Sequence, residues 1–142
     1  MIKNIRHTGI VVKDLEKSLY FYQGLLGFKI VKRQHEPDNF IDKILKMNGA
    51  QVETIKMAAV SGQLIELLHY TSPCSQEKQH NISDIGISHL AFSVEKLDEV
   101  YQLLLDNNVQ FLSAPQVSPD GFAKVAFCLA PEGTFIELAQ EL

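Results

Sequence analysis

Hydrophobic and polar residues alternate in two short segments that each begin with a histidine. The segments are His7-Thr-Gly-Ile-Val-Val12 and His89-Leu-Ala-Phe-Ser-Val94. A period of two is typical of a β-strand with one buried face. Each segment precedes a run of apolar residues at helical spacing. These residues are Leu15, Leu19, Tyr22 and Leu26 in the first run, and Leu97, Val100, Tyr101 and Leu104 in the second. The pattern therefore predicts a strand and then a helix in both places, with Gly27 and Asn107-Asn108 as the helix ends.

A second repeated pattern, G-x-x-I-E-L, follows later in each half of the chain. It reads Gly62-Gln-Leu-Ile-Glu66-Leu67 in the first half and Gly133-Thr-Phe-Ile-Glu137-Leu138 in the second. A turn precedes each copy, and a β-type run, 52–60 or 123–129, precedes each turn. This order is typical of a β-hairpin. Each half thus predicts strand, helix and three strands, a βαβββ module, which places the chain in the α+β class.

The two halves differ in length between these landmarks. The two histidines, His7 and His89, are 82 residues apart, and the two glutamates, Glu66 and Glu137, are 71 apart, so the first half carries 11 extra residues. We place this insertion around 36–49, where residues 40–47 have the spacing of a short amphipathic helix.

Strand alternation places one histidine and one glutamate of each half on the same face of its sheet. In the first half, His7 and Glu66 lie on the face opposite Ile10 and Ile65. In the second half, His89 and Glu137 likewise lie opposite Leu90, Phe92, Ile136 and Leu138. The apolar faces are the ones that we expect beneath the helices. Tyr70 and Phe135 share the His/Glu faces, whereas His35, His69 and His80 fall outside this set.

A histidine or glutamate on a strand is usually an ordinary surface or packing residue when taken alone. Here the same two residue types recur at equivalent positions of both halves. Ionisable groups on a partly apolar face are costly unless they are paired or bind a metal. Two neutral imidazoles and two carboxylates form a charge-neutral set for one divalent cation. The repeat therefore predicts one metal ion, Zn, Ni, Co, Mn or Fe, held by His7, Glu66, His89 and Glu137.

Length, charge and the first residues narrow the class of protein. The 142 residues are about one domain long, and the net charge is -4. This mild acidity argues against nucleic acid or an anionic membrane as the partner, because both favour clustered Lys and Arg. The start, MIKNIR, has no apolar signal core, and no run approaches the ~20 apolar residues of a membrane span. We therefore expect a cytoplasmic protein that acts on a small molecule.

Over essentially its whole length the chain resembles the vicinal oxygen chelate superfamily. The matching motifs are His7, Leu64-Ile-Glu66-Leu67, Gly86-Ile-Ser-His89-Leu-Ala-Phe92 and Pro131-Glu-Gly-Thr-Phe-Ile-Glu137-Leu138. The resemblance implies one domain, 1–142, with module one at 1–70, a linker at 71–85 and module two at 86–142. It also implies that paired βαβββ modules form a cup-shaped mixed sheet around the metal, and that the chain forms a homodimer. The cup could form within one chain or across two.

The complete His/Glu/His/Glu set resembles glyoxalase I and the methylmalonyl-CoA epimerases. The resemblance implies an isomerase, epimerase or lyase that removes a proton next to a carbonyl and stabilises an enediolate or enolate on the metal. It implies Glu137 as the base and Glu66 as the opposing acid or base. The implied substrate is a thioester or keto compound with adjacent oxygens. The alternative is a metal-dependent dioxygenase or a drug-binding resistance protein of the same superfamily.

The sequence also departs from these relatives. Bacterial glyoxalase I usually has an Arg four residues after the first His and an Asn four residues after the first Glu, for glutathione. Val11 and Tyr70 occupy those positions here. The epimerases use a second base, for which Glu36 and Asp42 are the two candidates, and either residue type is more often a plain surface acid.

Overall fold

The structure is a computed structural model that describes residues 1–142, with the exception of the side chain of Asp38. The chain divides into two compact units, Met1–Glu77 and Lys78–Leu142.

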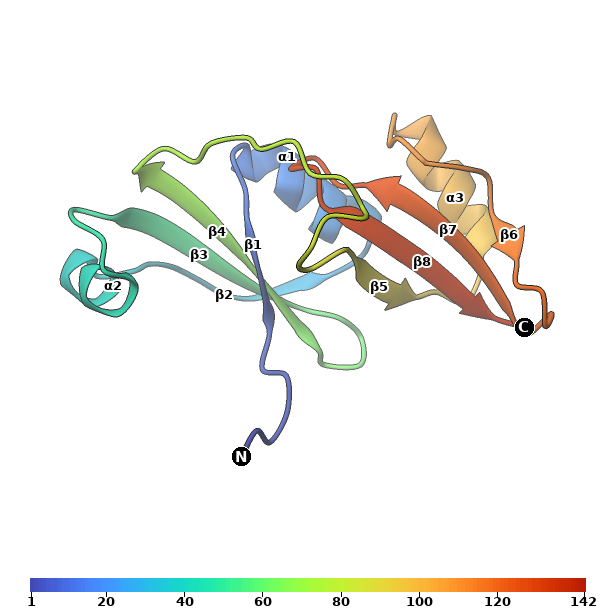
Figure 1. Cartoon of the computed structure of the whole chain (residues 1–142), viewed down its shortest axis with the longest axis horizontal. Helices are drawn as coiled ribbons and strands as arrows, with labels where there is room; N and C mark the ends of the chain where they lie inside the picture. The colour runs from blue at the N-terminus through green and yellow to red at the C-terminus, as the bar shows by residue number, and fades with distance from the viewer. The chain divides into compact units, whose positions relative to one another are not determined.

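The first unit contains one mixed four-stranded sheet (Figure 1). Its elements are β1 (Thr8–Val11), α1 (Leu15–Leu19), η1 (Tyr20–Leu25), β2 (Lys29–His35), α2 (Asp38–Leu45), β3 (Gln51–Ala58) and β4 (Leu64–Ser72). The strands lie in the order β1-β4-β3-β2. β1 is parallel to β4, and the other neighbours are antiparallel. β4 is therefore a central strand, whereas β1 lies at an edge of this sheet.

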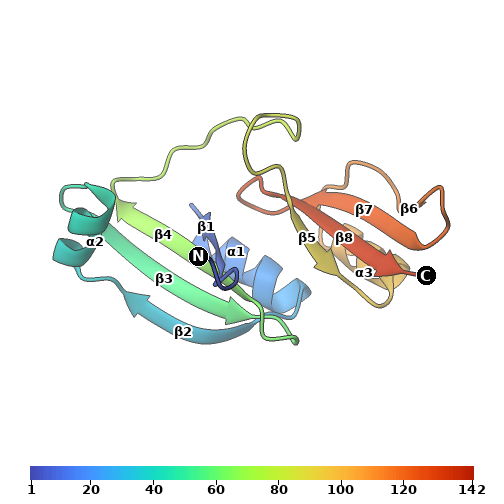
Figure 2. The same cartoon turned by 60° about the horizontal axis from the view of Figure 1, so that its bottom comes forward.

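The second unit repeats this sheet with a single helix. Its elements are β5 (Leu90–Ser93), α3 (Leu97–Asp106), β6 (Gln116–Val117), β7 (Ala123–Leu129) and β8 (Phe135–Glu141). The strand order is β5-β8-β7-β6, with β5 parallel to β8 and the other pairs antiparallel. In Figure 2, α3 lies along one face of this sheet. The two mixed sheets confirm the predicted α+β class and the βαβββ order of the modules.

Each core lies on the sheet face that the strand alternation predicted. In the first unit Ile10, Ile65 and Leu67 are buried. In the second unit Ile136 and Leu138 are fully buried. Cys128 is also buried, and this burial raises the pKa of its thiol to about 12, so the thiol is an uncharged core group.

The first helix departs from the predicted regular stripe. Asp14 caps α1 by accepting a hydrogen bond from the backbone N–H of Lys17 at 3.1 Å. The helix then widens into the π-helical segment η1, which ends where Leu26 N–H bonds to the carbonyl of Phe21 at 3.0 Å. A wider turn rotates the side chains relative to a 3.6-residue period. Phe21, which precedes most of this turn, is buried at 2% exposure although it lies outside the stripe; Ser18, three residues earlier, is buried as well, so the buried face of the helix is wider than the stripe.

The expected insertion helix is present as α2. It begins two residues before the predicted range of 40–47 and ends at Leu45, because Lys46 adopts a left-handed backbone with φ 52°. Ile41 of the helix packs in a cluster with Ala50 and Val52, against which Tyr70 also packs. The cross-strand pairing of Val52 with Tyr70 places both on the Glu66 face of the sheet. Helix α2 therefore covers the end of that face, as Figure 2 shows for its place beside β3 and β4.

The turns before the two glutamates have the same geometry. Gly62 and Gly133 have φ values of +88° and +90°, which favour glycine. Each donates its N–H, at 2.9 Å, to the carbonyl of the residue three positions before it, Ala59 or Ala130. Because equal turns fix equal strand register, the two glutamates occupy equivalent positions of their hairpins.

Among the described residues, none of the helices has the length and hydrophobicity of a membrane span.

Candidate metal-binding pairs

His7 and Glu66 come together in the first unit. Gly9 of β1 pairs with Glu66 of β4, so His7, two residues before Gly9, lies on the same face as Glu66. The Nε2 atom of His7 is 3.7 Å from Oε1 of Glu66, and the two side chains are 28% and 12% exposed. The Nδ1 atom of His7 is buried and has no hydrogen-bond partner among the described residues.

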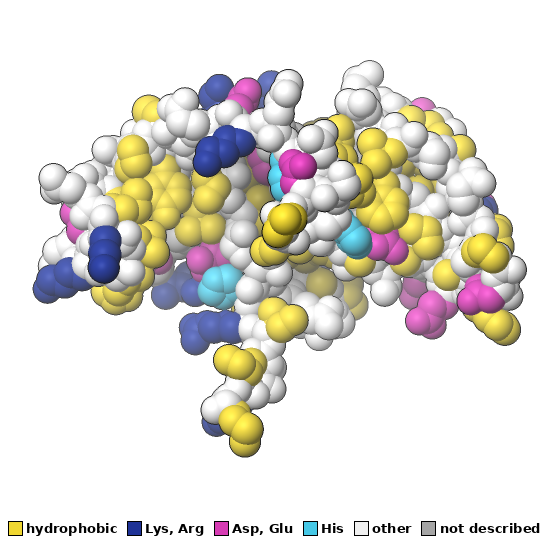
Figure 3. Space-filling view, in the orientation of Figure 1, with side chains coloured by type: hydrophobic (Ala, Val, Ile, Leu, Met, Phe, Trp, Pro, Cys, Tyr) yellow, Lys and Arg dark blue, Asp and Glu magenta, His cyan; other side chains and the backbone are white. Residues whose placement is uncertain are grey.

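His89 and Glu137 form the equivalent pair in the second unit. Ala91 of β5 pairs with Glu137 of β8 in the same parallel register. The Nε2 atom of His89 is 2.9 Å from Oε2 of Glu137, and Nδ1 of His89 is 3.0 Å from Oγ of Ser88. Figure 3 shows a histidine and an acidic side chain among hydrophobic side chains on the visible face of this unit. The sequence repeat thus brings one His and one Glu together in each unit.

The cross-strand neighbours of the two glutamates differ, and the sequence interpretation did not include them. Lys56 of β3 is the register partner of Glu66, and its Nζ is 3.2 Å from Oε2 of Glu66. Phe127 of β7 is the register partner of Glu137, and its ring lies edge-on to that of His89 with centroids 5.1 Å apart. Both neighbours precede their glutamate by ten residues across a hairpin turn. Counting residues across the hairpin turn would have identified both neighbours from the sequence.

His69 lies away from the Glu66 face, as the strand alternation predicted, and His35 shares its face. Both stand opposite Glu53 across the strands, and Glu53 also pairs with Arg33. The side-chain hydrogen bond from Arg33 is the main reason that the pKa of Glu53 lies below its ordinary value. His80 is 3.5 Å from Asp84 through Nδ1, and this contact lies within the segment that leads into β5.

The two candidate second acids have different surroundings. Both carboxylate oxygens of Asp42 accept backbone N–H bonds, from Gly49 at 2.7 Å and from Ala50 at 2.9 Å. Asp42 therefore closes the loop after α2. Glu36 accepts a hydrogen bond from the hydroxyl of Thr54 at 3.0 Å. Thr54 pairs with Leu68, which places this contact on the Glu66 face.

The donor chemistry and spacing of the two pairs fit a divalent metal. Bonds of ~2.0–2.2 Å to imidazole nitrogen and carboxylate oxygen place two ligand atoms of one ion about 3 Å apart. The 2.9 Å separation in the second unit matches this spacing, and the 3.7 Å separation in the first is somewhat wider. Within either unit, the described residues contain no group of three or more His, Cys, Asp or Glu side chains suited to a metal. Each unit thus offers one His–Glu pair with the spacing of two metal ligands.

The sequence matches the family described as the Glyoxalase/Bleomycin resistance protein/Dioxygenase superfamily over residues 4–138. The chain is 31% identical to the protein YwkD of Bacillus subtilis over 111 residues, which cover 78% of this chain and 76% of YwkD. It is 27% identical to a probable lactoylglutathione lyase of Synechocystis, covering 94% of this chain and 92% of that protein. It is 24% identical to the mitochondrial methylmalonyl-CoA epimerase of Homo sapiens, covering 96% of this chain and 73% of the epimerase.

Solved structures show the same fold. A glyoxalase family protein from Bacillus cereus has a TM-score of 0.90 at 21% identity, covering 100% of this chain and 96% of that one. A glyoxalase family protein from Enterococcus faecalis has a TM-score of 0.72 at 23% identity, covering 96% and 97%. The family match spans nearly the whole chain, and the repeated sheets agree with it. The chain therefore belongs to the Glyoxalase/Bleomycin resistance protein/Dioxygenase superfamily, the vicinal oxygen chelate superfamily that its sequence resembles.

Proposed function

We propose that this protein is a divalent-metal-dependent isomerase, epimerase or glyoxalase-type lyase acting on a small carbonyl compound. The observation that carries the proposal is the pair of His–Glu contacts, His7 with Glu66 and His89 with Glu137, at equivalent positions of two equivalent sheets. Relatives described as lactoylglutathione lyase and methylmalonyl-CoA epimerase support the same class of reaction.

In this proposal His7, Glu66, His89 and Glu137 hold one ion, with the two pairs supplied by one chain or by two chains of a homodimer. A bound divalent ion supplies Lewis-acid stabilisation of the negative charge that develops on a carbonyl oxygen. Neutral imidazole and carboxylate ligands suit Zn, Ni, Co, Mn and Fe(II) alike, so the donor set leaves the metal open.

The chain's own residues then move the proton. Glu137 removes the proton next to the carbonyl, and Glu66 acts as the opposing acid or base. The surroundings of the two carboxylates support this assignment. Lys56 occupies one oxygen of Glu66, whereas Glu137 has no Lys or Arg partner within ion-pair distance in the described part of its unit. Glu36 is favoured over Asp42 as a further acid or base, because both oxygens of Asp42 already accept backbone bonds.

The proposed substrate is a thioester or keto compound with adjacent oxygens. Glutathione is disfavoured as its carrier because the two positions that usually bind it hold Val11 and Tyr70. Tyr70 instead packs against the cluster beneath helix α2. Screening should therefore compare α-hydroxythioesters, methylmalonyl-CoA and keto sugars before glutathione adducts.

Metal content per chain, measured by mass spectrometry, tests the site. The wild type should carry close to one ion per chain after loading, and His7→Ala and His89→Ala should each lose most of it. His69→Ala is the matched control, because His69 lies on the opposite face of β4 from Glu66. Loss of a residue that only hydrogen-bonds to a metal ligand typically weakens metal binding about 10- to 100-fold. Loss of a ligand itself should weaken metal binding by at least that much. Full metal retention by both ligand variants would refute the four-residue site.

A further inference from the structure

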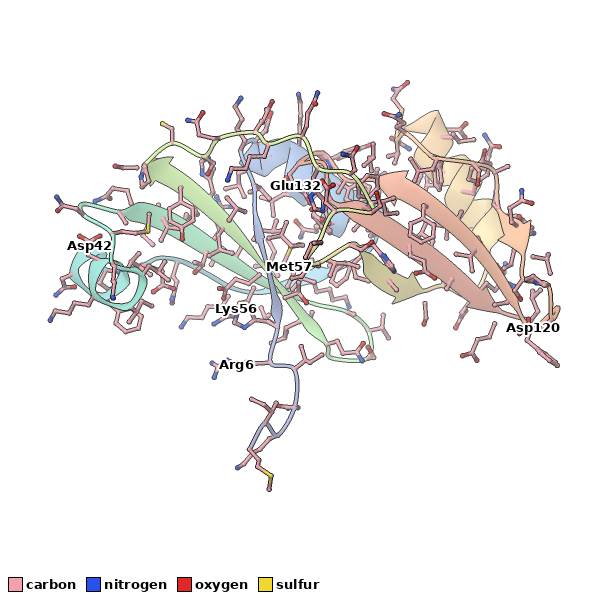
Figure 4. All side chains as sticks on the ribbon, in the orientation of Figure 1. Arg6, Asp42, Lys56, Met57, Asp120 and Glu132 are labelled. Carbon is pink, nitrogen blue, oxygen red and sulfur yellow. The ribbon has the colours of Figure 1, made fainter. Side chains whose placement is uncertain are left out.

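Lys56 is a lysine in an unusual place, on the sheet face that bears the first-half His–Glu pair. Lysine side chains are mostly exposed, whereas that of Lys56 is only 25% exposed. Its Nζ is 3.2 Å from Oε2 of Glu66, and Oε1 of the same carboxylate faces His7 at 3.7 Å. Figure 4 labels Lys56 on the first unit, next to Met57 of β3. Met57, one residue on, is fully buried on the other face.

The second unit has no equivalent of this charge. Phe127 occupies the matching register position opposite Glu137. The lysine of that strand, Lys124, is 22% exposed and binds Asp98 of α3. Lys124 is three residues from Phe127, so its side chain lies on the helix-covered face rather than on the Glu137 face. Among the residues that the structure describes, a lysine ammonium therefore lies beside the glutamate of the His–Glu pair only in the first half.

A count of charges gives Lys56 a consequence, which rests on the proposed metal site. The carboxylates of Glu66 and Glu137 balance a divalent ion, and the two imidazoles are neutral ligands. The ammonium of Lys56 adds one positive charge to this balanced set. On the same sheet face, Lys32, which pairs with Lys56 across β2 and β3, and Glu36 carry charges of opposite sign that cancel in the count. A partly covered site with a net positive charge attracts an anion more strongly than a neutral molecule.

The donors of Lys56 also leave room for a ligand. An ammonium has three N–H donors and no acceptor. Oxygen Oε2 of Glu66 is the one ion-pair partner of Lys56 among the described residues. The remaining N–H donors of Lys56 can bind a carboxylate oxygen of a ligand. Charged hydrogen bonds of this kind are stronger than neutral ones.

We propose that Lys56 determines specificity by binding a carboxylate group of the substrate, so that the protein acts on carbonyl compounds that carry a free carboxylate. Neutral keto compounds and neutral hemithioacetals lack the group that Lys56 binds. The lysine also holds Glu66 through Oε2, which leaves Oε1 directed toward His7.

Calorimetric titration of the cobalt-loaded protein with malonate, and with its neutral analogue malonamide, tests this proposal. The variants are Lys56→Met, which removes the charge and keeps most of the length, and Lys56→Arg, which keeps the charge. Lys124→Met is the matched control, since Lys124 is similarly covered and paired but lies on the other face. Metal content and the circular dichroism spectrum of each variant are measured first.

We expect Lys56→Met to retain metal and to bind malonate at least about tenfold more weakly, the scale of one charged hydrogen bond. Lys56→Arg should keep most of the affinity, and Lys124→Met should match the wild type. Malonamide should bind weakly to all four proteins. Three outcomes would overturn the role of Lys56 and leave the proposed function untouched. They are equal malonate affinity in Lys56→Met and wild type, an equal loss of affinity in Lys124→Met, and no malonate binding by metal-loaded wild type. A wild type that takes up no metal would overturn this proposal together with the proposed function.

Discussion

The two halves of the chain share a framework but differ around their glutamates. Both place a glutamate on a central strand and a histidine just before an edge strand, with the same glycine turn before the glutamate. Around Glu66 the first half adds Lys56 and the helix α2, whereas Phe127 lies beside Glu137 in the second half. A repeated sheet can thus keep the positions of a His–Glu pair constant while the side chains around each glutamate differ.

The His–Glu separations follow the same division. The contact is 2.9 Å in the second half, where Glu137 has no lysine beside it among the described residues, and 3.7 Å in the first, where Lys56 also binds Glu66. A carboxylate engaged by an ammonium is a poorer proton acceptor than one without such a partner. We therefore expect Glu66 and Glu137 to contribute unequally to catalysis. The same substitution made in each half tests this expectation.

Replacing each glutamate by glutamine should give the largest difference between the halves. We expect Glu137→Gln to reduce kcat by about 10²- to 10⁴-fold, because general base catalysis is lost while the side-chain size is kept. Glu66→Gln should reduce kcat less and weaken metal binding more. Turnover and solvent proton exchange with the substrate found by screening, together with metal content, measure both effects. Unchanged turnover in Glu137→Gln would remove Glu137 as the base.

Equivalent core positions should respond alike, in contrast to the glutamates. Leu67 and Leu138 are both fully buried, beside Glu66 and Glu137 in sequence. Leu67→Ala and Leu138→Ala should each lower the free energy of unfolding by about 2–5 kcal/mol, through lost burial and the cavity left behind. Urea denaturation measures the change, and Leu103→Ala, at a position 45% exposed, is the control. A cost confined to one half would show that the two cores are packed differently.

The two turn glycines provide a smaller and more local comparison. A Cβ at Gly62 or Gly133 would meet nothing within 4 Å, so only the positive φ opposes substitution. Gly62→Ala and Gly133→Ala should each cost about 1–2 kcal/mol of stability. Thermal unfolding should show similar decreases in Tm for both, and asparagine, which tolerates left-handed backbone better, should lose less. A clear inequality would mean that one turn relaxes where the other does not.

The smallest effect is expected at Glu53, which has no acidic counterpart in the second half. Lys124 stands at the equivalent position there. Since Arg33 holds the pKa of Glu53 below its ordinary value of 4.5, the pair stabilises the folded state above that pH. This stability is lost as the pH falls through the lowered pKa. Because Arg33 is 44% exposed and screened by solvent, Glu53→Gln should cost only about 0.5 kcal/mol at pH 7.

Urea denaturation of wild type and Glu53→Gln at pH 7 and pH 3 measures this pH dependence. The difference between the two proteins should shrink at the lower pH. A constant difference at both pH values would show that the charge of Glu53 is not its cause.

The repeated patterns were sufficient to predict the sheets, the insertion helix and the pairing of His with Glu inside each unit. Strand alternation and turn geometry are local properties that a sequence carries directly. The burial of Phe21 was missed because the apolar stripe left out Ser18, a polar residue that is buried three positions before it on the same side of the helix. Lys56 was missed because each strand was considered by itself, and a cross-strand neighbour depends on the register of two strands. The assembly of the four residues around one ion stays a prediction.

The position of each histidine just before an edge strand has a kinetic consequence. β1 and β5 are four residues long and each has one neighbour within its own sheet, whereas β4 and β8 are bonded on both sides. Short edge strands open locally at a lower free-energy cost than central strands. The amide hydrogens of Val12 and Val94, which donate to the carbonyls of Leu68 on β4 and Ala139 on β8, should therefore exchange with solvent faster than those that bond β4 to β3 and β8 to β7. In the proposed metal site, local opening of β1 and β5 would displace the histidines before the glutamates, so it would limit how fast a bound metal exchanges.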